Sequence, residues 1–339
     1  MNNYYIPAPS NSVTGGQECL HQLCDSLNKS GKNAFIVYYP DVYSPIPDVY
    51  KKYQVQVEVE IKDLESNTII LHESQFDRLF DFKNIKVIFW WLSVDNFFKS
   101  SMRYLSIVDY IRNCPNLLLK AIAVKLYYIF IRHKNILNRQ LSISQLKYKS
   151  NLNLCQSVYA EKFLRNNGFD NLFQLNDYIN SEFKIFDNTS RDNIILYNPK
   201  KGYEFQKFLI QKFPSYNWVP VINMNYSQIS ELMNRAKIYV DFGNHPGRDK
   251  IPREAVAAGL CIVTGIHGSA FYYGDIPISD MYKFDQNNFD SARFKVVIDG
   301  LLENYSDEKE NFKVYRTMVS DSESLFHRQV KDLILKGFI

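Results

Sequence analysis

The segment 238–264 constrains the fold more than any other part of the chain. The apolar run Ile238–Asp241 ends in a polar loop that contains two glycines, Gly243 and Gly247. A helix is expected to begin near Pro252, because proline suits the first helical turn, and the apolar run Cys261–Thr264 follows. This order of strand, loop, helix and strand is typical of an open α/β sheet.

The loop within this segment is a candidate anion site. It carries His245, Arg248 and Lys250 between the end of the strand and the start of the helix. Free N–H groups at a helix start favour negative charge, and ligands of open α/β sheets collect outside the carboxyl ends of the strands. We therefore expect a phosphate here, and the alternative is a plain loop that binds nothing.

At these residues the chain resembles the donor half of GT-B glycosyltransferases, which move a sugar from a nucleotide sugar to an acceptor. Many retaining members carry two glutamates separated by seven residues in this loop and helix. Glu254, which precedes Ala255 and Gly259, resembles the second glutamate, and Pro246 occupies the place of the first. The resemblance implies that Glu254 fixes a donor hydroxyl, on the ribose, and makes Glu254 and His245 candidate catalytic residues.

Length and composition indicate a two-domain globular protein. The chain has 339 residues, of which 46% are hydrophobic and 22% charged, enough for two cores. A net charge of +4 is too small to indicate nucleic acid, although it is compatible with anionic ligands or a membrane surface. Five cysteines without a CxxC pair predict neither a disulfide framework nor a zinc site, and no leader sequence is evident. We expect a cytoplasmic protein.

The amino-terminal half predicts a parallel sheet. After the strand-like run Tyr4–Ile6, Gly15 and Gly16 precede a helical pattern that contains Glu18. Paired glycines allow a ligand to approach the backbone closely. In GT-B enzymes a glycine loop at this place lies on the acceptor side, which makes Gly15, Gly16 and Glu18 acceptor candidates. The alternative is a simple tight turn.

Two later apolar runs, Thr68–Leu71 and Lys86–Trp91, end in polar residues that suit an active site. Asp95 follows the second run and is a candidate general base, since an acceptor hydroxyl must lose its proton to a group within hydrogen-bond reach. Its alternative role is a helix cap. His72 and Glu73, after the first run, are further acceptor-side candidates.

Residues 101–149 differ in character from their surroundings. They are predicted to be helical, apolar and basic, and their longest apolar run, 117–131, contains Lys120 and Lys125. This run is shorter than the roughly 20 residues that a membrane-spanning helix needs. The segment is predicted either to lie on an anionic membrane surface or to be a buried helix or an oligomer contact.

The polar stretch 187–193 predicts a linker because it lacks apolar periodicity and is rich in turn formers. We expect an acceptor-binding domain at 1–186 and a nucleotide-sugar-binding domain at 187–339. Both are expected to be Rossmann-like and doubly wound, and to face each other across a cleft. The last helix is expected to pack back on the first domain.

The turn Asn198–Gly202 follows the first strand of the second domain. It resembles the Lys-Gly element with which GT-B donor domains hold a nucleotide diphosphate, and Lys201 is the preferred phosphate ligand. The alternative is a solvated turn. Further candidate donor contacts lie after other strands of this domain, and the full donor set is Asn198, Lys200, Lys201, Val221, Asn223, Arg248, Lys250, Glu254, His267, Gly268 and Ser269.

The resemblance therefore implies a GT-B glycosyltransferase that acts on a glycan or lipid-linked oligosaccharide in surface polysaccharide synthesis, such as that of O-antigen. It is expected to need neither a metal nor a cofactor, to bind no nucleic acid, and to be cytoplasmic or peripheral on the inner face of the cytoplasmic membrane. Two alternatives remain: a nucleotide-sugar epimerase of the same architecture, and a non-catalytic binding or assembly subunit, which Pro246 favours.

Overall fold

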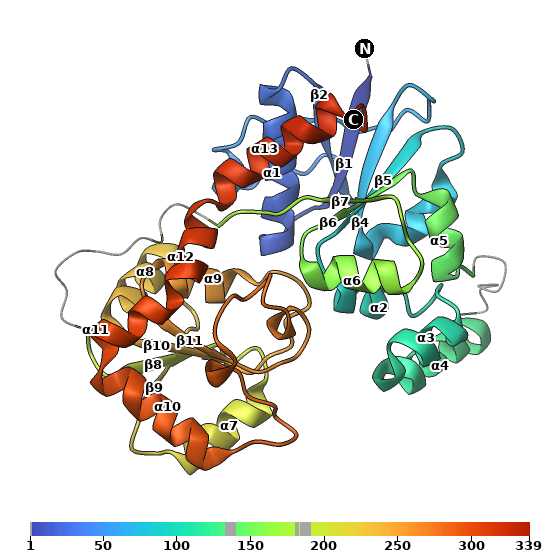
Figure 1. Ribbon diagram of the computed structural model, residues 1–339. Helices are drawn as coiled ribbons and strands as arrows, with labels where there is room; N and C mark the ends of the chain where they lie inside the picture. Colours follow the sequence, from blue (N-terminus) through green and yellow to red (C-terminus); the bar gives the residue numbers. More distant parts are fainter. Residues whose placement is uncertain (1, 133–139, 180–182, 184–190) are drawn as a thin grey trace. The chain divides into compact units, whose positions relative to one another are not determined.

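The computed structural model describes residues 2–132, 140–179, 183 and 191–339. The chain forms two compact units (Figure 1). The first comprises Met1–Asp177 with Phe326–Ile339, and the second comprises Tyr178–Leu325. The predicted domain boundary, between 186 and 187, lies outside the described residues. The division between the units falls earlier in the chain, and most of the final helix is part of the first unit.

The first unit is built on a seven-stranded parallel sheet in the order β3-β2-β1-β4-β5-β6-β7. Its strands are β1 (Asn3–Pro9), β2 (Asn33–Tyr39), β3 (Gln56–Val57), β4 (Thr68–His72), β5 (Lys86–Trp91), β6 (Leu152–Cys155) and β7 (Leu172–Gln174). The chain winds outward from β1 to β3 and then returns to β4 on the other side of β1. The carboxyl ends of β1 and β4 therefore flank the switch point, where ligands of such sheets bind.

Helices cover both faces of this sheet. They are α1 (Gly15–Lys29), η1 (Asp48–Tyr50), η2 (Glu73–Asp81), α2 (Val94–Ser100), α3 (Ile107–Asn113), η3 (Pro115–Leu117), α4 (Leu118–Leu126), η4 (Tyr127–Ile131), α5 (Ile143–Lys149), α6 (Val158–Asn166) and α13 (Ser322–Leu335). On one face Trp91 packs with Phe97 of α2 and Phe163 of α6. On the other, the ring of Trp90 lies 6.5 Å from that of Phe326 in α13. Burial on both faces explains the uninterrupted apolar runs of the strands.

Most of the described part of the segment 101–149 is helical, as predicted, in α3, η3, α4, η4 and α5. Along α4 and η4, Ala121 and Lys125 are buried, whereas Leu119 and Phe130 are exposed. No described helix of the chain is long and apolar enough to cross a membrane.

The second unit contains a four-stranded parallel sheet in the order β11-β10-β8-β9. Its strands are β8 (Ile194–Tyr197), β9 (Asn217–Pro220), β10 (Ile238–Asp241) and β11 (Cys261–Thr264). Its helices are α7 (Tyr203–Lys212), α8 (Tyr226–Arg235), α9 (Lys250–Ala257), η6 (Ser269–Phe271), η7 (Asp280–Tyr282), α10 (Ser291–Glu303), α11 (Tyr305–Glu308), η8 (Lys309–Phe312) and α12 (Lys313–Ser320). The order reverses between β8 and β10, so the loops after these two strands flank the switch point.

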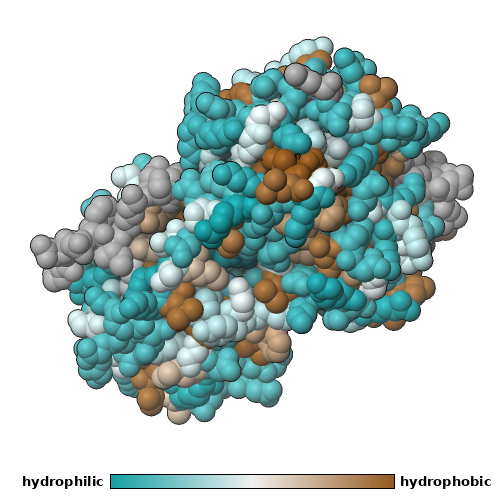
Figure 2. Space-filling model, turned by 45° about the horizontal axis from the view of Figure 1, so that its top comes forward, coloured by the Kyte–Doolittle hydropathy of each residue, from teal (hydrophilic) through white to brown (hydrophobic). Residues whose placement is uncertain are grey.

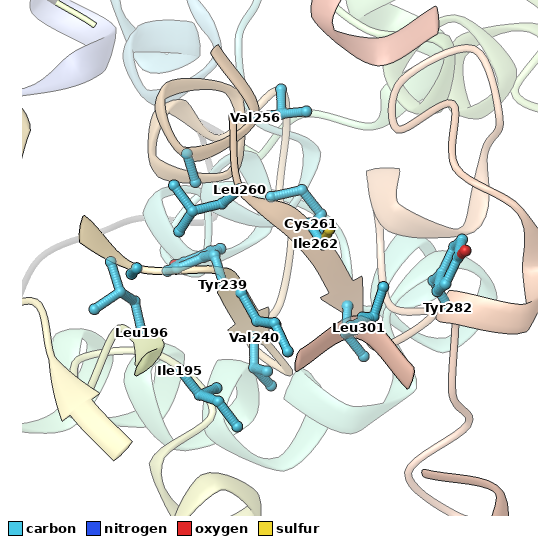
Figure 3. Close-up of a cluster of buried hydrophobic side chains, with 14 of the residues drawn as sticks. Ile195, Leu196, Tyr239, Val240, Val256, Leu260, Cys261, Ile262, Tyr282 and Leu301 are labelled. Atoms are coloured by element: carbon cyan, nitrogen blue, oxygen red, sulfur yellow. The ribbon is translucent and has the colours of Figure 1, made fainter. Parts of the chain in front are cut away.

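Alternate side chains of β8 and β10 point to opposite faces of the second sheet (Figure 3). Leu196 and Tyr239 lie on one face, and Ile195 and Val240 lie on the other. All four are fully buried. The two sheets, each with helices on both faces, confirm the predicted α/β class with doubly wound parallel sheets.

Arg191 ties together the carboxyl ends of two helices in the second unit. Its guanidinium donates hydrogen bonds to the carbonyl oxygens of Met233 (2.8 Å) and Ala236 (2.7 Å) at the end of α8, and to that of Ala258 (2.5 Å) at the end of α9. The last carbonyls of a helix have no partner within the helix, and a cation there is favoured by the helix dipole. Arg191 therefore fixes the position of α9 beneath the loop that precedes it.

We expect Arg191→Met to lower the free energy of unfolding by about 2–4 kcal/mol, because the carbonyls of three fully buried residues lose charged hydrogen-bond donors. Urea unfolding followed by circular dichroism measures the loss. The control is Arg235→Met, which removes an equal charge from an exposed ion pair with Asp192 (3.0 Å) and should cost less than about 1 kcal/mol. Equal losses in the two variants would contradict the role assigned to Arg191.

Candidate functional site

The two loops at the switch point of the second sheet touch each other. Gly202 has φ +60°, and a Cβ added there would lie 2.5 Å from the carbonyl oxygen of Phe242. A Cβ added at Gly243 would lie 2.6 Å from the Cβ of Lys201. Both positions therefore require glycine, because any side chain would force the loops apart. The loop after β8 and the loop after β10 consequently form one continuous surface.

Lys201 reaches from the first loop to the second. Its ammonium nitrogen lies 2.7 Å from Oδ1 of Asp249, the residue that precedes α9, and its side chain is one-third exposed. The ion pair holds Lys201 at the amino end of α9, where free backbone N–H groups also favour an anion. The structure thus brings together the two basic loops that the sequence singled out, with Lys200 exposed beside Lys201.

His245 is fully buried between two carboxylates. Its Nε2 lies 3.6 Å from Oδ1 of Asp241, and its Nδ1 lies 3.4 Å from Oδ2 of Asp249. Asp241 is itself fixed, since it accepts hydrogen bonds from the hydroxyl of Tyr239 (2.9 Å) and the N–H of Gly243 (2.8 Å). The imidazole therefore contacts carboxylates beneath the loop and is not on the surface.

The loop after β11 is joined to the same surface. Gly268 has φ +61°, and a Cβ there would overlap the carbonyl oxygen of His245. That carbonyl accepts a hydrogen bond from the N–H of Ser269 (2.8 Å), whose hydroxyl donates to the carbonyl of Gly247 (2.7 Å). Gly268 and Ser269 therefore hold the two loops together, and the half-buried side chain of His267 lies on the same loop.

Several buried polar atoms at this edge have no hydrogen-bond partner among the described residues. They are both ring nitrogens of His245, Oδ2 of Asp249 and Oγ1 of Thr264. Such atoms are rare in folded proteins, and each costs about 1–3 kcal/mol. This concentration at the carboxyl ends of β10 and β11 is what a binding site for a polar ligand is expected to show.

Lys283 is a candidate that the sequence did not reveal. Its backbone forms a bridge with Thr264. Its side chain is buried, its ammonium nitrogen lacks a hydrogen-bond partner within the described residues, and burial lowers its pKa. No strand or glycine pattern marks this position, because a connection that is irregular apart from the two short helical turns η6 and η7 brings it beside β11.

The remaining donor candidates lie on or beside these loops. Arg248 and Glu254 are both buried, Lys250 is the first residue of α9, and Arg253 donates hydrogen bonds to the carbonyls of Arg248 (2.8 Å) and Asp249 (3.1 Å). Asn198 shapes the first loop by accepting a hydrogen bond from the N–H of Lys200 (3.0 Å). Val221, which is buried, and Asn223, which has φ +56°, follow β9 at the edge of the sheet next to β8.

In the first unit the acceptor-side candidates gather at the switch point of its own sheet. Gly15 and Gly16 begin α1 after the five-residue loop 10–14 that follows β1, and a Cβ at Gly16 would lie 3.8 Å from Leu92, an ordinary contact. Glu18 is buried, accepts a hydrogen bond from the hydroxyl of Tyr53 (2.8 Å) and pairs with Lys52 (3.1 Å). Because a Cβ at position 16 would make only an ordinary contact, the fold itself does not require glycine there.

His72 and Glu73 lie at the carboxyl end of β4 and are both buried. Burial raises the pKa of Glu73 to about 7, and its Oε2 accepts a hydrogen bond from the N–H of Leu92 (3.0 Å). Burial lowers the pKa of His72 to about 4, and its ring nitrogens contact the hydroxyls of Ser74 (2.8 Å) and Tyr39 (3.3 Å). A carboxyl that titrates near neutrality is suited to proton transfer.

Asp95 lies in the first turn of α2, after β5. The helix cap is Ser93, whose hydroxyl accepts a hydrogen bond from the N–H of Asn96 (3.1 Å), so Asp95 does not serve as the cap. Its Oδ1 instead accepts a hydrogen bond from the hydroxyl of Tyr159 (3.0 Å). Because β4 and β5 are neighbours, Asp95 and Glu73 follow adjacent strands.

No group of three or more His, Cys, Asp or Glu side chains in the described part of the chain has a geometry that would hold a metal ion.

Comparison with known proteins identifies the architecture. No family model and no curated protein sequence matches the chain. Among solved structures, sucrose-phosphate synthase from Thermosynechococcus elongatus aligns over 100% of this chain and 99% of its own, with a TM-score of 0.63 and 11% identity. HepE from Anabaena in complex with UDP-glucose aligns over 98% and 99%, with a TM-score of 0.61 and 10% identity. The chain has the GT-B fold. The predicted fold and the resemblance to GT-B glycosyltransferases are thereby confirmed.

Glu73→Gln is expected to change how stability depends on pH. Folding raises the pKa of Glu73 from 4.5 to about 7, so its contribution to stability is present below pH 4.5 and is lost as the pH rises through about 7. The variant should therefore gain stability relative to the native protein between pH 5 and 8, by up to about 3 kcal/mol.

Urea unfolding of the native protein and of Glu73→Gln, each at pH 5 and at pH 8, tests this expectation. The contribution of His72, which is lost as the pH falls because its folded pKa is depressed, is common to both proteins and cancels in the difference. Glu204→Gln, which changes an exposed carboxyl, is the control. A difference between the variant and the native protein that does not change with pH would show that Glu73 titrates normally.

Proposed function

We propose that this protein is a glycosyltransferase that moves a sugar from a nucleotide sugar to a glycan or lipid-linked oligosaccharide acceptor in the synthesis of a surface polysaccharide such as O-antigen. The observation that carries the proposal is the convergence of Lys201, the start of α9 and the loop after β11 at the switch point of the second sheet. Nucleotides bind at such points in open α/β sheets. Support also comes from HepE, whose structure contains UDP-glucose, and from WaaG, a glycosyltransferase of lipopolysaccharide biosynthesis (TM-score 0.52, 12% identity, 97% and 98% of the two chains).

The donor side of the reaction requires stabilisation of a departing nucleoside diphosphate. Negative charge grows on the diphosphate as the sugar leaves, and preorganised cations and N–H groups lower the energy of that state. Lys201, Arg248 and the first N–H groups of α9 would supply this stabilisation, while Glu254 would fix a ribose hydroxyl. Because Lys201 pairs with Asp249, a bound diphosphate would compete with that carboxylate for the ammonium group.

The acceptor side requires a base that takes the proton from the hydroxyl attacking the anomeric carbon. Asp95 and Glu73 both follow strands of the first sheet at its carboxyl edge. Asp95 is the more accessible of the two, whereas Glu73 has a pKa of about 7, which suits a base at neutral pH. Gly15, Gly16, Glu18 and His72 would line the same acceptor position.

A lipid-linked acceptor fits the character of the segment 101–149. Leu119, Phe130 and Ile131 are at least 64% exposed, and lysines and arginines lie between and around them. On the face drawn in Figure 2, hydrophobic clusters interrupt a mostly hydrophilic surface. An apolar face flanked by cations is typical of proteins that lie on an anionic leaflet. We therefore propose a peripheral location on the inner face of the cytoplasmic membrane.

Nucleoside diphosphates should raise the melting temperature of the protein, because a ligand of the folded state stabilises it. A thermal-shift panel of UDP, GDP, dTDP, CDP, CMP and ADP would identify the donor class, and UDP is the first candidate because HepE binds UDP-glucose. Lys201→Ala should abolish the shift. The matched control, Lys207→Ala, removes an exposed lysine from α7 and should retain it. A protein that none of the six nucleotides stabilises would not be a nucleotide-sugar transferase of this kind.

Nucleotide binding should be independent of divalent metal, because lysine, arginine and helix N–H groups supply the positive charge. The melting-temperature increase produced by the stabilising nucleotide is expected to be the same in EDTA as in Mg²⁺ or Mn²⁺. An increase that appears only with a divalent cation would disprove metal independence and leave the transferase proposal intact.

A further inference from the structure

The first unit contains a cavity of about 530 Å³ at the base of the exposed helical segment. It lies between η2, the carboxyl end of α2, the connection that follows α2, and one face of α4 and η4. On that face Lys120, Val124 and Tyr128 follow one another at helical spacing. None of the residues predicted to bind donor or acceptor lines it. The proposed glycosyltransferase function therefore leaves this cavity without a role.

The cavity gathers positive charge. Lys99, Arg103 and Lys120 line it, and Asp77 is the single acidic residue of its lining. Within the described part of the chain, none of the three basic side chains makes an ion pair or a side-chain hydrogen bond with a carboxylate. Burial raises the pKa of the nearby Asp77 carboxyl, and Arg103 lowers that pKa by less. The lining still has an excess of two positive charges, which matches a phosphate dianion.

Arg103 is oriented in advance for such a ligand. Its guanidinium lies 4.8 Å from the ring centroid of Tyr104 and 4.5 Å from that of Tyr128, so contacts with two rings restrict its movement. The ammonium of Lys125 fixes its backbone through a hydrogen bond to its carbonyl (3.2 Å). Its Nε is buried and has no partner among the described residues. A rigid guanidinium with an unsatisfied donor is suited to a phosphate oxygen.

The surrounding segment, residues 101–149, accounts for the net positive charge of the protein. Residues 101–149 contain nine lysines and arginines and one acidic residue, Asp109, whereas the rest of the chain contains 31 basic and 35 acidic residues. The net charge of +4 therefore arises entirely from this segment. Leu119 and Leu126, which are both exposed, lie on the helix that contributes Lys120 to the cavity.

We propose that this cavity binds a phosphate group, with the guanidinium of Arg103 as the principal donor and Lys99 and Lys120 as the counter-charges. The same chemistry is offered by a soluble phosphate and by the headgroup of a phospholipid. The site is independent of nucleotide binding in the second unit, and its test does not use glycosyl transfer.

Two binding measurements distinguish the sources. Inorganic phosphate is titrated into the full chain by isothermal titration calorimetry, and sedimentation is measured with phosphatidylcholine vesicles that do or do not contain phosphatidic acid. The variants are Arg103→Met and the double variant Lys99→Ala/Lys120→Ala. The matched control, Arg112→Ala/Lys149→Ala, removes the same charge from exposed positions of the same region outside the cavity. Lys201→Ala separates this site from the nucleotide site.

Both cavity variants are expected to weaken binding of at least one probe about tenfold, whereas the control double variant and Lys201→Ala should change it less than about threefold. Loss for inorganic phosphate identifies a soluble ligand, and loss for phosphatidic acid vesicles alone identifies a headgroup. Equal losses of binding in the cavity and control double variants would show that the probe is attracted by the overall positive charge of the region, and would overturn the proposal. The proposal would also be overturned if the native protein bound neither inorganic phosphate nor the vesicles that contain phosphatidic acid. Because Lys99 and Lys120 are exposed, their double variant remains informative even if Arg103→Met fails to fold.

Discussion

The close contact between the loops that follow β8 and β10 is the constraint on which the candidate donor site depends. Gly202 and Gly243 allow these backbones to meet, and the ion pair between Lys201 and Asp249 closes the contact. A side chain at either glycine would separate Lys201 from the amino end of α9. The positive charge of this edge is therefore a property of the packed loops as much as of the individual basic residues.

Two carboxylates, Asp241 and Asp249, lie among the basic residues of this edge. Asp241 is held by Tyr239 and Gly243, while Asp249 pairs with Lys201 and also lies 3.4 Å from His245. A nucleotide diphosphate would enter a region where Lys201 already has an acidic neighbour, Asp249. Binding would then exchange one anion for another, which limits the electrostatic cost of the unliganded state.

The sequence predicted most of the fold because parallel strands covered on both faces appear as short apolar runs. It did not indicate β3, whose two residues, Gln56 and Val57, are exposed. The sequence also located the loops of the donor site, since glycine and lysine follow strands there. It did not indicate that His245 is buried or that Lys283 lies beside Thr264, because these arrangements depend on contacts between loops. The basic cavity was equally hidden, as Asp77, Lys99, Arg103 and Lys120 come from separate elements.

The most direct test of the account is hydrogen–deuterium exchange of the full chain with and without saturating UDP. The account predicts slower exchange in peptides that cover 198–204, 242–252 and 265–270, the three loops of the second unit, and unchanged exchange in 3–29 of the first. Unchanged exchange in all three loops, or protection confined to the first unit, would contradict the assignment of the nucleotide site to the switch point of the second sheet.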